Sequence, residues 1–143
     1  WQQGGPLTLI IIDIDHFKQI NDRHGHQAGD EAIRQLAREL KSWAPDQQQL
    51  GRLGGEEFLV AMTLDGASCW QLAEQLRHRV AYLAAPHMTV SIGVAERSPE
   101  DEHLDQLIHR ADMAMYQAKR QGRNQTVLAQ HPGDGDELAC NVA

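Results

Sequence analysis

The feature that most constrains the fold is a run of apolar and β-branched residues at positions 7–12, which is followed directly by Asp13-Ile14-Asp15. Such a run predicts a β-strand, and its lack of apolar–polar alternation indicates that both faces of the strand are buried. A strand buried on both faces needs packed layers on each side. We therefore expect this strand at the centre of a sheet, with two carboxylates where it ends.

Further strands and helices alternate along the rest of the chain. Apolar residues recur at helical spacing in three segments, and shorter β-type runs lie between them. The pair Gly54-Gly55 joins two of the short runs and suits a hairpin turn. We expect strands at 7–12, 50–53, 58–62, 88–94 and 126–128, and helices at 30–40, 72–83 and 104–115, the last helix ending near Gly122. This order predicts an α+β fold, a sandwich in which helices flank a sheet of mixed direction.

The size and charge of the chain limit its partners. With 143 residues, of which 41% are hydrophobic, it has the length and composition of one globular domain with one core. A net charge of -7 gives no basic face for a nucleic-acid polymer, which we exclude as a partner. A nucleotide is not excluded, because a metal ion and a few cations can offset phosphate charge locally.

Cysteine usage and hydropathy bear on location. Cys69 and Cys140 stand in no metal-ligand spacing and favour a reducing compartment over a disulfide framework. No stretch approaches the ~20 apolar residues of a membrane span. We expect a cytoplasmic domain, and membrane attachment of the full-length protein stays open. Residues 131–143 are rich in Gly and Asp without apolar periodicity, so we expect a domain at 1–130 and a mobile tail.

Four acidic residues stand where they can gather around a divalent cation. Asp13 and Asp15 close the first strand, and Glu56 and Glu57 follow the glycine turn. Mg²⁺ binds through a few carboxylates and keeps positions for substrate phosphates, which favours phosphoryl or nucleotidyl transfer. The alternative is that these acids only end a strand and a hairpin. Against it, an unpaired Asp13 at the edge of the core is costly to bury.

Several separated motifs occur in order between residues 7 and 128. They are Asp-Ile-Asp-His-Phe-Lys-Gln-Ile-Asn-Asp at 13–22, Gly25-His26, Gly29-Asp30-Glu31, Gly-Gly-Glu-Glu-Phe at 54–58, Ser-Ile-Gly-Val at 91–94, Ala111-Asp112, Tyr-Gln-Ala-Lys at 116–119 and Gly-Arg-Asn at 122–124. In this combination the chain resembles the GGDEF family of diguanylate cyclases. The resemblance implies a ferredoxin-like palm, as in nucleotidyl cyclases, with a mainly antiparallel central sheet flanked by helices.

The resemblance also implies the reaction. Two GTP molecules are condensed into cyclic di-GMP with release of pyrophosphate, and each active site holds one nucleotide, so two copies of the domain must face each other. Mg²⁺, with Mn²⁺ as a substitute, would be held by Asp13, the Ile14 carbonyl, Glu56 and Glu57. Glu56 and Glu57 are the expected catalytic acids, with Glu56 the candidate for helping to deprotonate the attacking 3′-hydroxyl.

Guanine selection is assigned to Asn21 and Asp30. Guanine presents two adjacent donors that one carboxylate can accept together, which suits Asp30, and by resemblance Asn21 joins it at the guanine edge. The alternative for Asp30 alone is a helix N-cap.

Phosphate binding is assigned by resemblance to Lys119 and Arg123, with a further contact from Lys18, and Gly54 and Gly55 belong to the substrate site as well. The alternative for Lys119 and Arg123 is that two cations near a helix end only complement its dipole.

Two stretches depart from the family pattern. Many members carry Arg-x-x-Asp, at which cyclic di-GMP binds and inhibits, but residues 44–50 read Ala-Pro-Asp-Gln-Gln-Gln-Leu, so we predict no product inhibition through that site. The family's leading Asp-x-Leu-Thr-x-Leu segment is absent before Leu7, which indicates an N-terminally truncated piece of a protein with an N-terminal sensor or dimerisation module. The alternatives to a GTP cyclase are a non-catalytic GTP-binding or protein-interaction module of the same fold, and a variant that joins GTP to ATP.

Overall fold

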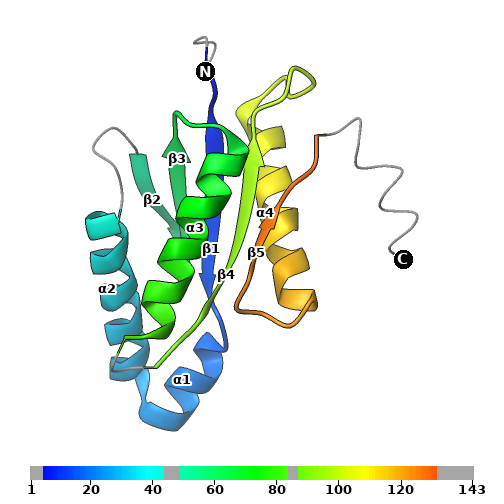
Figure 1. Ribbon diagram of the computed structural model, residues 1–143. Coiled ribbons are helices and arrows are strands. Elements are labelled where there is room, and N and C mark those ends of the chain that lie inside the picture. Colours follow the sequence, from blue (N-terminus) through cyan, green and yellow to red (C-terminus); the bar gives the residue numbers. More distant parts are fainter. Residues whose placement is uncertain (1–4, 44–48, 84–86, 132–143) are drawn as a thin grey trace.

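A five-stranded sheet of order β2-β3-β1-β4-β5 runs through the computed structural model, which describes residues 5–43, 49–83 and 87–131 (Figure 1). The strands are β1 (Thr8–Ile14), β2 (Gln49–Gly54), β3 (Glu57–Met62), β4 (Val90–Glu96) and β5 (Thr126–Leu128). The pairs β2–β3, β3–β1 and β1–β4 are antiparallel, and β5 pairs with β4 in parallel. The predicted mixed, mainly antiparallel sheet with the first strand at its centre is therefore confirmed.

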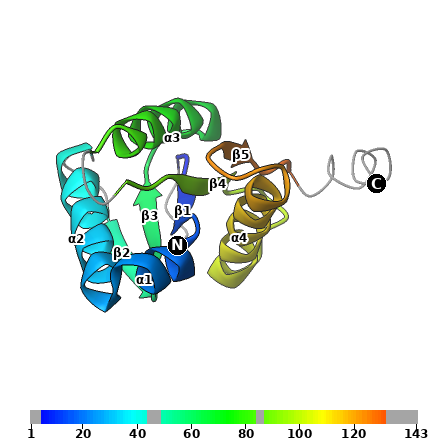
Figure 2. The ribbon, with the colours of Figure 1, turned by 90° about the horizontal axis from the view of Figure 1, so that it is seen from below.

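Helices cover both faces of the sheet. They are α1 (Phe17–His24), α2 (His26–Trp43), α3 (Gly66–Ala81) and α4 (Leu104–Arg120). Helices α2 and α3 lie over one face and α4 over the other (Figure 2), while α1 lies beyond the end of β1 (Figure 1). This arrangement is the predicted α+β sandwich.

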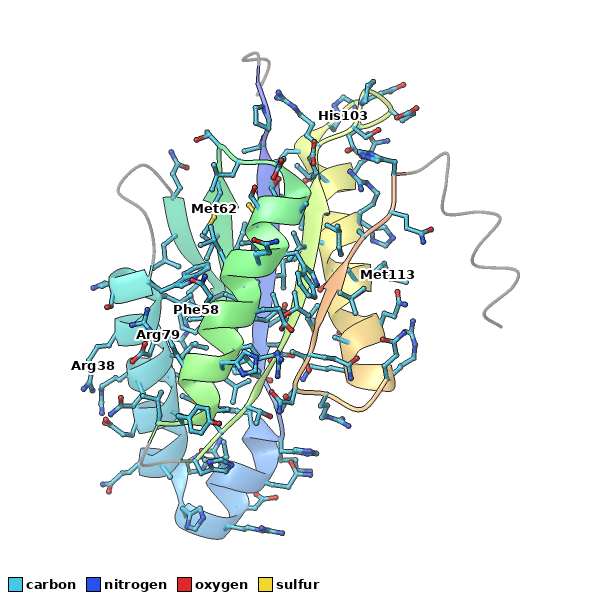
Figure 3. All side chains as sticks on the ribbon, viewed as in Figure 1. Arg38, Phe58, Met62, Arg79, His103 and Met113 are labelled. Atoms are coloured by element: carbon cyan, nitrogen blue, oxygen red, sulfur yellow. The ribbon has the colours of Figure 1, made fainter. Side chains whose placement is uncertain are left out.

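The two faces of β1 supply two separate cores, which explains its nearly unbroken apolar run. Ile10 and Ile12 pack with the buried faces of α2 and α3, whereas Leu9 and Ile11 pack with α4. All seven residues of β1 are buried. Complete burial of one such side chain contributes roughly 1.5–3 kcal/mol. Phe58 and Met62, labelled in Figure 3, add to the core on the α2–α3 side.

The helices differ from the prediction in several places, and α3 begins at Gly66 rather than near residue 72. Helix α1 was not expected, and α2 begins at His26 rather than near residue 30. Only Ile20 is buried in α1, so this short helix has no apolar stripe to reveal it. Because Asp30 lies inside α2, its interpretation as an N-cap is wrong.

Helix α4 approaches β4 unusually closely at Gly93. A Cβ atom on Gly93 would lie 2.1 Å from the Ala111 carbonyl oxygen and 2.3 Å from the Met115 nitrogen. No side chain fits there without moving the helix, so glycine fixes how near α4 lies to the central strands. The close approach gives a physical reason for the glycine in the Ser-Ile-Gly-Val motif.

Some predictions fall on residues that the structure does not describe. Residues 44–48 of the changed inhibitory stretch lie outside the described residues, as does the expected tail apart from His131. Within the described part, Cys69 is a buried free thiol, and Cys140 lies outside that part. None of the helices within the described ranges is long and apolar enough to cross a membrane.

Candidate active site

The hairpin between β2 and β3 brings two acidic residues to the end of β1. Gly55 takes a φ of 43°, which favours glycine, and the pairing of β2 with β3 shifts register between Arg52 and Gly54. Arg52 fixes the turn by donating from Nε and Nη2 to the Gly55 carbonyl at 2.9 and 2.6 Å. Sequence reasoning missed Arg52, although it stands two residues before the glycine pair. The turn, residues 54–57, is called the acid turn below.

Asp13 and Glu57 are cross-strand neighbours. They are directly paired between the antiparallel strands β1 and β3. Next to them, the Ile14 N–H donates to the Glu56 carbonyl at 3.4 Å. Side chains on directly opposed residues lie about 5 Å apart at Cβ, so the two carboxylates share one face of the sheet. The structure thus brings together Asp13, the Ile14 backbone, Glu56 and Glu57.

These acids are crowded and only partly neutralised. Asp13 is 7% exposed, and its Oδ2 lies 3.2 Å from Lys119 Nζ. Burial raises the pKa of Asp13 to about 6; Lys119 works in the opposite direction, while Glu56 and Asp15 add to the rise. The pKa of Glu57 is also raised, by burial first and then by the charges of Asp13 and Asp112. The site is short of positive charge.

Asp15 is turned to a different set of partners from Asp13. Its carboxylate accepts hydrogen bonds from Thr89 Oγ1 at 2.7 Å, Ser91 Oγ at 2.6 Å and the Asn124 N–H at 3.0 Å. The hypothesis that both strand-end acids serve one metal is therefore not supported for Asp15, whose oxygens are already engaged. These three partners of Asp15 were not predicted, although Ser91 and Asn124 stand in family motifs.

The residues predicted to select guanine come from adjacent helices. Asn21 lies on α1, and Gly29 and the exposed Asp30 lie on α2. A Cβ atom on Gly29 would lie 2.0 Å from Asn21 Oδ1, so the glycine makes room for the amide. This oxygen is buried and has no hydrogen-bond partner within the described residues. A buried amide oxygen without a partner, next to Asp30, suits a ligand that donates hydrogen bonds.

Of the three predicted phosphate-binding cations, Lys119 lies beside the acids. Lys119 extends from the last turn of α4 to Asp13 and also lies 3.6 Å from Asp15. It therefore does more than complement the helix dipole. Arg123 and Lys18 are exposed, and no hydrogen bond or ion pair engages their charged groups within the described part of the chain. The structure joins Lys119 to the acids but does not bring Arg123 or Lys18 into contact with them.

Two hollows adjoin these groups. One of about 540 Å³ lies between the acid turn and α4, and its lining includes Glu56, Glu57, Asp112 and Tyr116. A larger hollow of about 950 Å³ is lined by residues of α1, by the first turns of α2 and by residues 87–89, which lead into β4. Asp13 lines neither hollow, but all four residues of the acid turn line the smaller one, so we associate the chemistry with the smaller hollow.

Comparisons with known proteins agree with this fold. Among solved structures, the active GGEEF domain of a diguanylate cyclase from Vibrio cholerae superimposes with a TM-score of 0.85 at 37% identity, covering 89% of this chain and 85% of that one. The GGDEF domain of DgcB from Caulobacter crescentus, in complex with c-di-GMP, gives a TM-score of 0.82 at 35% identity over 88% of this chain and 79% of that one. The fold is the palm of nucleotidyl cyclases.

Sequence comparison then narrows this class to one family. Residues 2–125 match the family described as diguanylate cyclase, GGDEF domain, and the chain belongs to that family. Diguanylate cyclase DgcM of Escherichia coli (strain K12) is 44% identical over 128 residues, or 85% of this chain and 30% of the relative. A diguanylate cyclase of Vibrio cholerae is 39% identical over 128 residues, or 86% of this chain and 40% of the relative. The chain thus spans well under half the length of these curated relatives.

Diguanylate cyclases of this family generally depend on a divalent metal. The residues present fit such an ion: Asp13 Oδ1 is buried without a hydrogen-bond partner among the described residues, and the nearby donors are hard oxygens. No group of three His, Cys, Asp or Glu side chains in the described ranges is already arranged around one point. Lys119 neutralises Asp13 only in part, and an ion would require the acidic side chains to turn toward it.

Proposed function

We propose that this domain condenses two GTP molecules into cyclic di-GMP with release of pyrophosphate. The observation that carries the proposal is the direct pairing of Asp13 with Glu57, beside an intact acid turn. This pairing collects acidic oxygens at the end of a buried strand, where the raised pKa of Asp13 marks a charge that lacks its full complement of cations.

Asp13, the Ile14 carbonyl, Glu56 and Glu57 would hold Mg²⁺ or, as a substitute, Mn²⁺. When bound, the ion supplies positive charge against the α-phosphate and lowers the pKa of the attacking 3′-hydroxyl. Glu57 faces Asp13 across the strands, which favours metal binding as its role, whereas Glu56 lies in the turn itself and is our candidate for receiving the proton from the hydroxyl.

Charge on the substrate would be met by the three cations and the turn backbone. Lys119 already lies beside the acids, and it would exchange contact with Asp13 for a phosphate oxygen when the nucleotide enters. Arg123 and Lys18 are exposed and available for the remaining phosphates. Gly54 and Gly55 have no side chain between their backbone and the nucleotide, so the chain can approach closely.

Specificity for guanine would come from Asn21 and Asp30. The buried Asn21 oxygen has no partner within the described residues, and a guanine donor would satisfy it. Adenine presents no matching pair of donors, so it would leave this amide and Asp30 unpaired, which is the physical source of strong discrimination.

Catalysis would need a second copy of the domain, since each site is proposed to hold one nucleotide. A solved structure of DgcB comprises a coiled coil and a GGDEF domain, and one of SiaD is a complex with its activator SiaC. By analogy, an N-terminal sensor or dimerisation module in the longer protein would bring two domains together. We assign the domain to the cytosol, where GTP is available and thiols stay reduced.

The test is cyclic di-GMP formation from GTP and Mg²⁺ by the chain fused to a dimerising coiled coil. Glu56→Ala should abolish product, while Glu102→Ala, which changes an exposed acid on a different loop, should not. A dimeric parent that binds GTP but makes no product would instead support a non-catalytic GTP-binding module. A mixed product formed at a comparable rate from GTP and ATP would contradict selection by Asp30.

A further inference from the structure

The turn that follows α4 has an unfavourable backbone conformation. Gly122, Arg123 and Asn124 have φ values of 121°, 66° and 49°. Residues with a Cβ atom rarely adopt positive φ, and two in succession are rarer still. Such a turn persists only where its surroundings hold it. Residues 122–124 are called the arginine turn below, because they present Arg123 at the surface.

One side of the arginine turn is held by the end of the central strand. The Asn124 N–H donates to Asp15 Oδ2 at 3.0 Å. Asp15 is 2% exposed and is itself held by the hydroxyls of Thr89 and Ser91. The acceptor for the turn is thus rigidly set inside the sheet.

The other side is held by Arg77 of α3. Its Nη1 donates to both the carbonyl and the side-chain oxygen of Asn124, at 3.1 and 3.0 Å. The guanidinium is oriented in turn by Glu74, which accepts from Nη2 at 3.0 Å and from Thr126 Oγ1 at 2.8 Å. The Arg77 side chain is only 15% exposed, and the residue lines neither hollow.

We propose that Arg77 is a positioning residue for nucleotide binding, which acts through Asn124 to hold Arg123 where a nucleotide phosphate is bound. The proposal rests on the function proposed above and extends it to α3, which packs on the sheet face opposite α4. Arg77 and Asp15 both form hydrogen bonds with Asn124, Arg77 with its oxygens and Asp15 with its N–H. Without Arg77, the turn can relax toward ordinary φ values and carry the Arg123 side chain away.

The geometry also predicts which substitutions matter. A guanidinium donates to two oxygens of Asn124 and to Glu74 at once, because its donors form a fixed fork. A lysine keeps the charge but donates from one point. Arg77→Lys should therefore fall between the parent and Arg77→Met, whereas a role of charge alone would leave Arg77→Lys like the parent.

The test measures affinity for a GTP analogue with a methylene group between the α- and β-phosphorus, with Mg²⁺, by calorimetry on the 143-residue chain. We expect Arg77→Met to weaken binding by about 2- to 30-fold, the range of indirect couplings of this kind. The matched control is Arg110→Met, because Arg110 is equally exposed at 15% and holds Asp101 and the Glu96 carbonyl elsewhere. It should lower the melting temperature without changing affinity. All variants are compared below their melting temperatures, with folding checked by circular dichroism.

The decisive comparison is made in an Arg123→Met background. If Arg77 acts through Arg123, adding Arg77→Met there should cause little further loss of affinity. The proposal is overturned if Arg77→Met binds as tightly as the parent, or if its effect is undiminished without Arg123. A parent that does not bind the analogue would overturn the proposed function and this inference with it. An Arg123→Met variant that binds the analogue normally would overturn the phosphate-binding role of Arg123 and this inference, and would leave the proposed condensation of GTP standing.

Discussion

Replacing Asp13 with asparagine should stabilise the metal-free protein at neutral pH while abolishing cyclic di-GMP formation. Burial raises the pKa of Asp13 from 3.8 to about 6, even with the Lys119 ammonium at 3.2 Å. In the unfolded chain the carboxyl group has its ordinary pKa. Between the two values the folded state binds the proton more tightly than the unfolded state does, so stability falls as the pH rises through this window.

The size of the effect follows from the two pKa values. A rise from 3.8 to about 6 corresponds to about 3 kcal/mol of lost stability once the pH is above both values, for example at pH 7.5. At pH 5 the loss is about half as large, because folded Asp13 is still mostly protonated. Asparagine has nearly the same shape and no charge, so Asp13→Asn should recover up to these amounts.

The assay is urea unfolding followed by circular dichroism, with EDTA present, at pH 5 and pH 7.5. Asp101→Asn is the control, for which we expect the opposite change in stability. Burial acts to raise the pKa of Asp101, but hydrogen bonds from Arg110 and the Ser98 N–H bring it below its ordinary value, so this substitution should destabilise. An Asp13→Asn protein less stable than the parent at pH 7.5, or a gain that does not shrink at pH 5, would refute the reasoning.

Three other outcomes are expected. Mg²⁺ should raise the melting temperature of the parent, and EDTA should reverse the increase. The increase should be smaller for Asp13→Asn, and equal increases in melting temperature would contradict a metal site at Asp13. In a denaturant titration, Gly93→Ala should lower the free energy of unfolding by about 1–3 kcal/mol or more, because the added Cβ would lie 2.1 Å from a backbone oxygen. The control is Gly51→Ala at an exposed position, where a Cβ meets no atom within 4 Å, and it should change the free energy of unfolding little. Arg52→Gln should lower cyclic di-GMP formation about tenfold or more by loosening the acid turn, with an unchanged melting temperature, while exposed Arg38→Gln should leave turnover unaltered.

The central strand and the acid hairpin could be predicted because their signals are local. The run at 7–12 lacks polar alternation, and the structure shows the cause: two cores, one on each side of β1. The glycine pair likewise predicts a turn, and in the structure Gly55 has the positive φ that favours glycine. With the register that follows, Glu57 has to lie opposite Asp13. Proximity of these acids was therefore within reach of sequence reasoning.

Other parts of the site depend on contacts between distant segments. Helix α1 carries one buried residue, Ile20, and starts after His16, whose φ of 56° no composition rule predicts. Asp15 stands two residues from Asp13 but is bonded to Thr89 and Asn124, which are 74 and 109 residues away in the chain. Sequence spacing places the two acids at one strand end, but it contains nothing about which tertiary partner each one finds.

The central place of β1 has a consequence for how the protein is made. Both of its neighbours, β3 and β4, come later in the chain, and the bond from Asp15 to Asn124 closes the last part of the site. Pairings of such long sequence separation form slowly. During synthesis β1 emerges before both of its partners, and its backbone edges stay unpaired and its apolar faces uncovered until residues 57–62 and 90–96 follow. Aggregation on the ribosome would begin at this strand, and slower translation or a chaperone that covers it should raise the yield of folded protein.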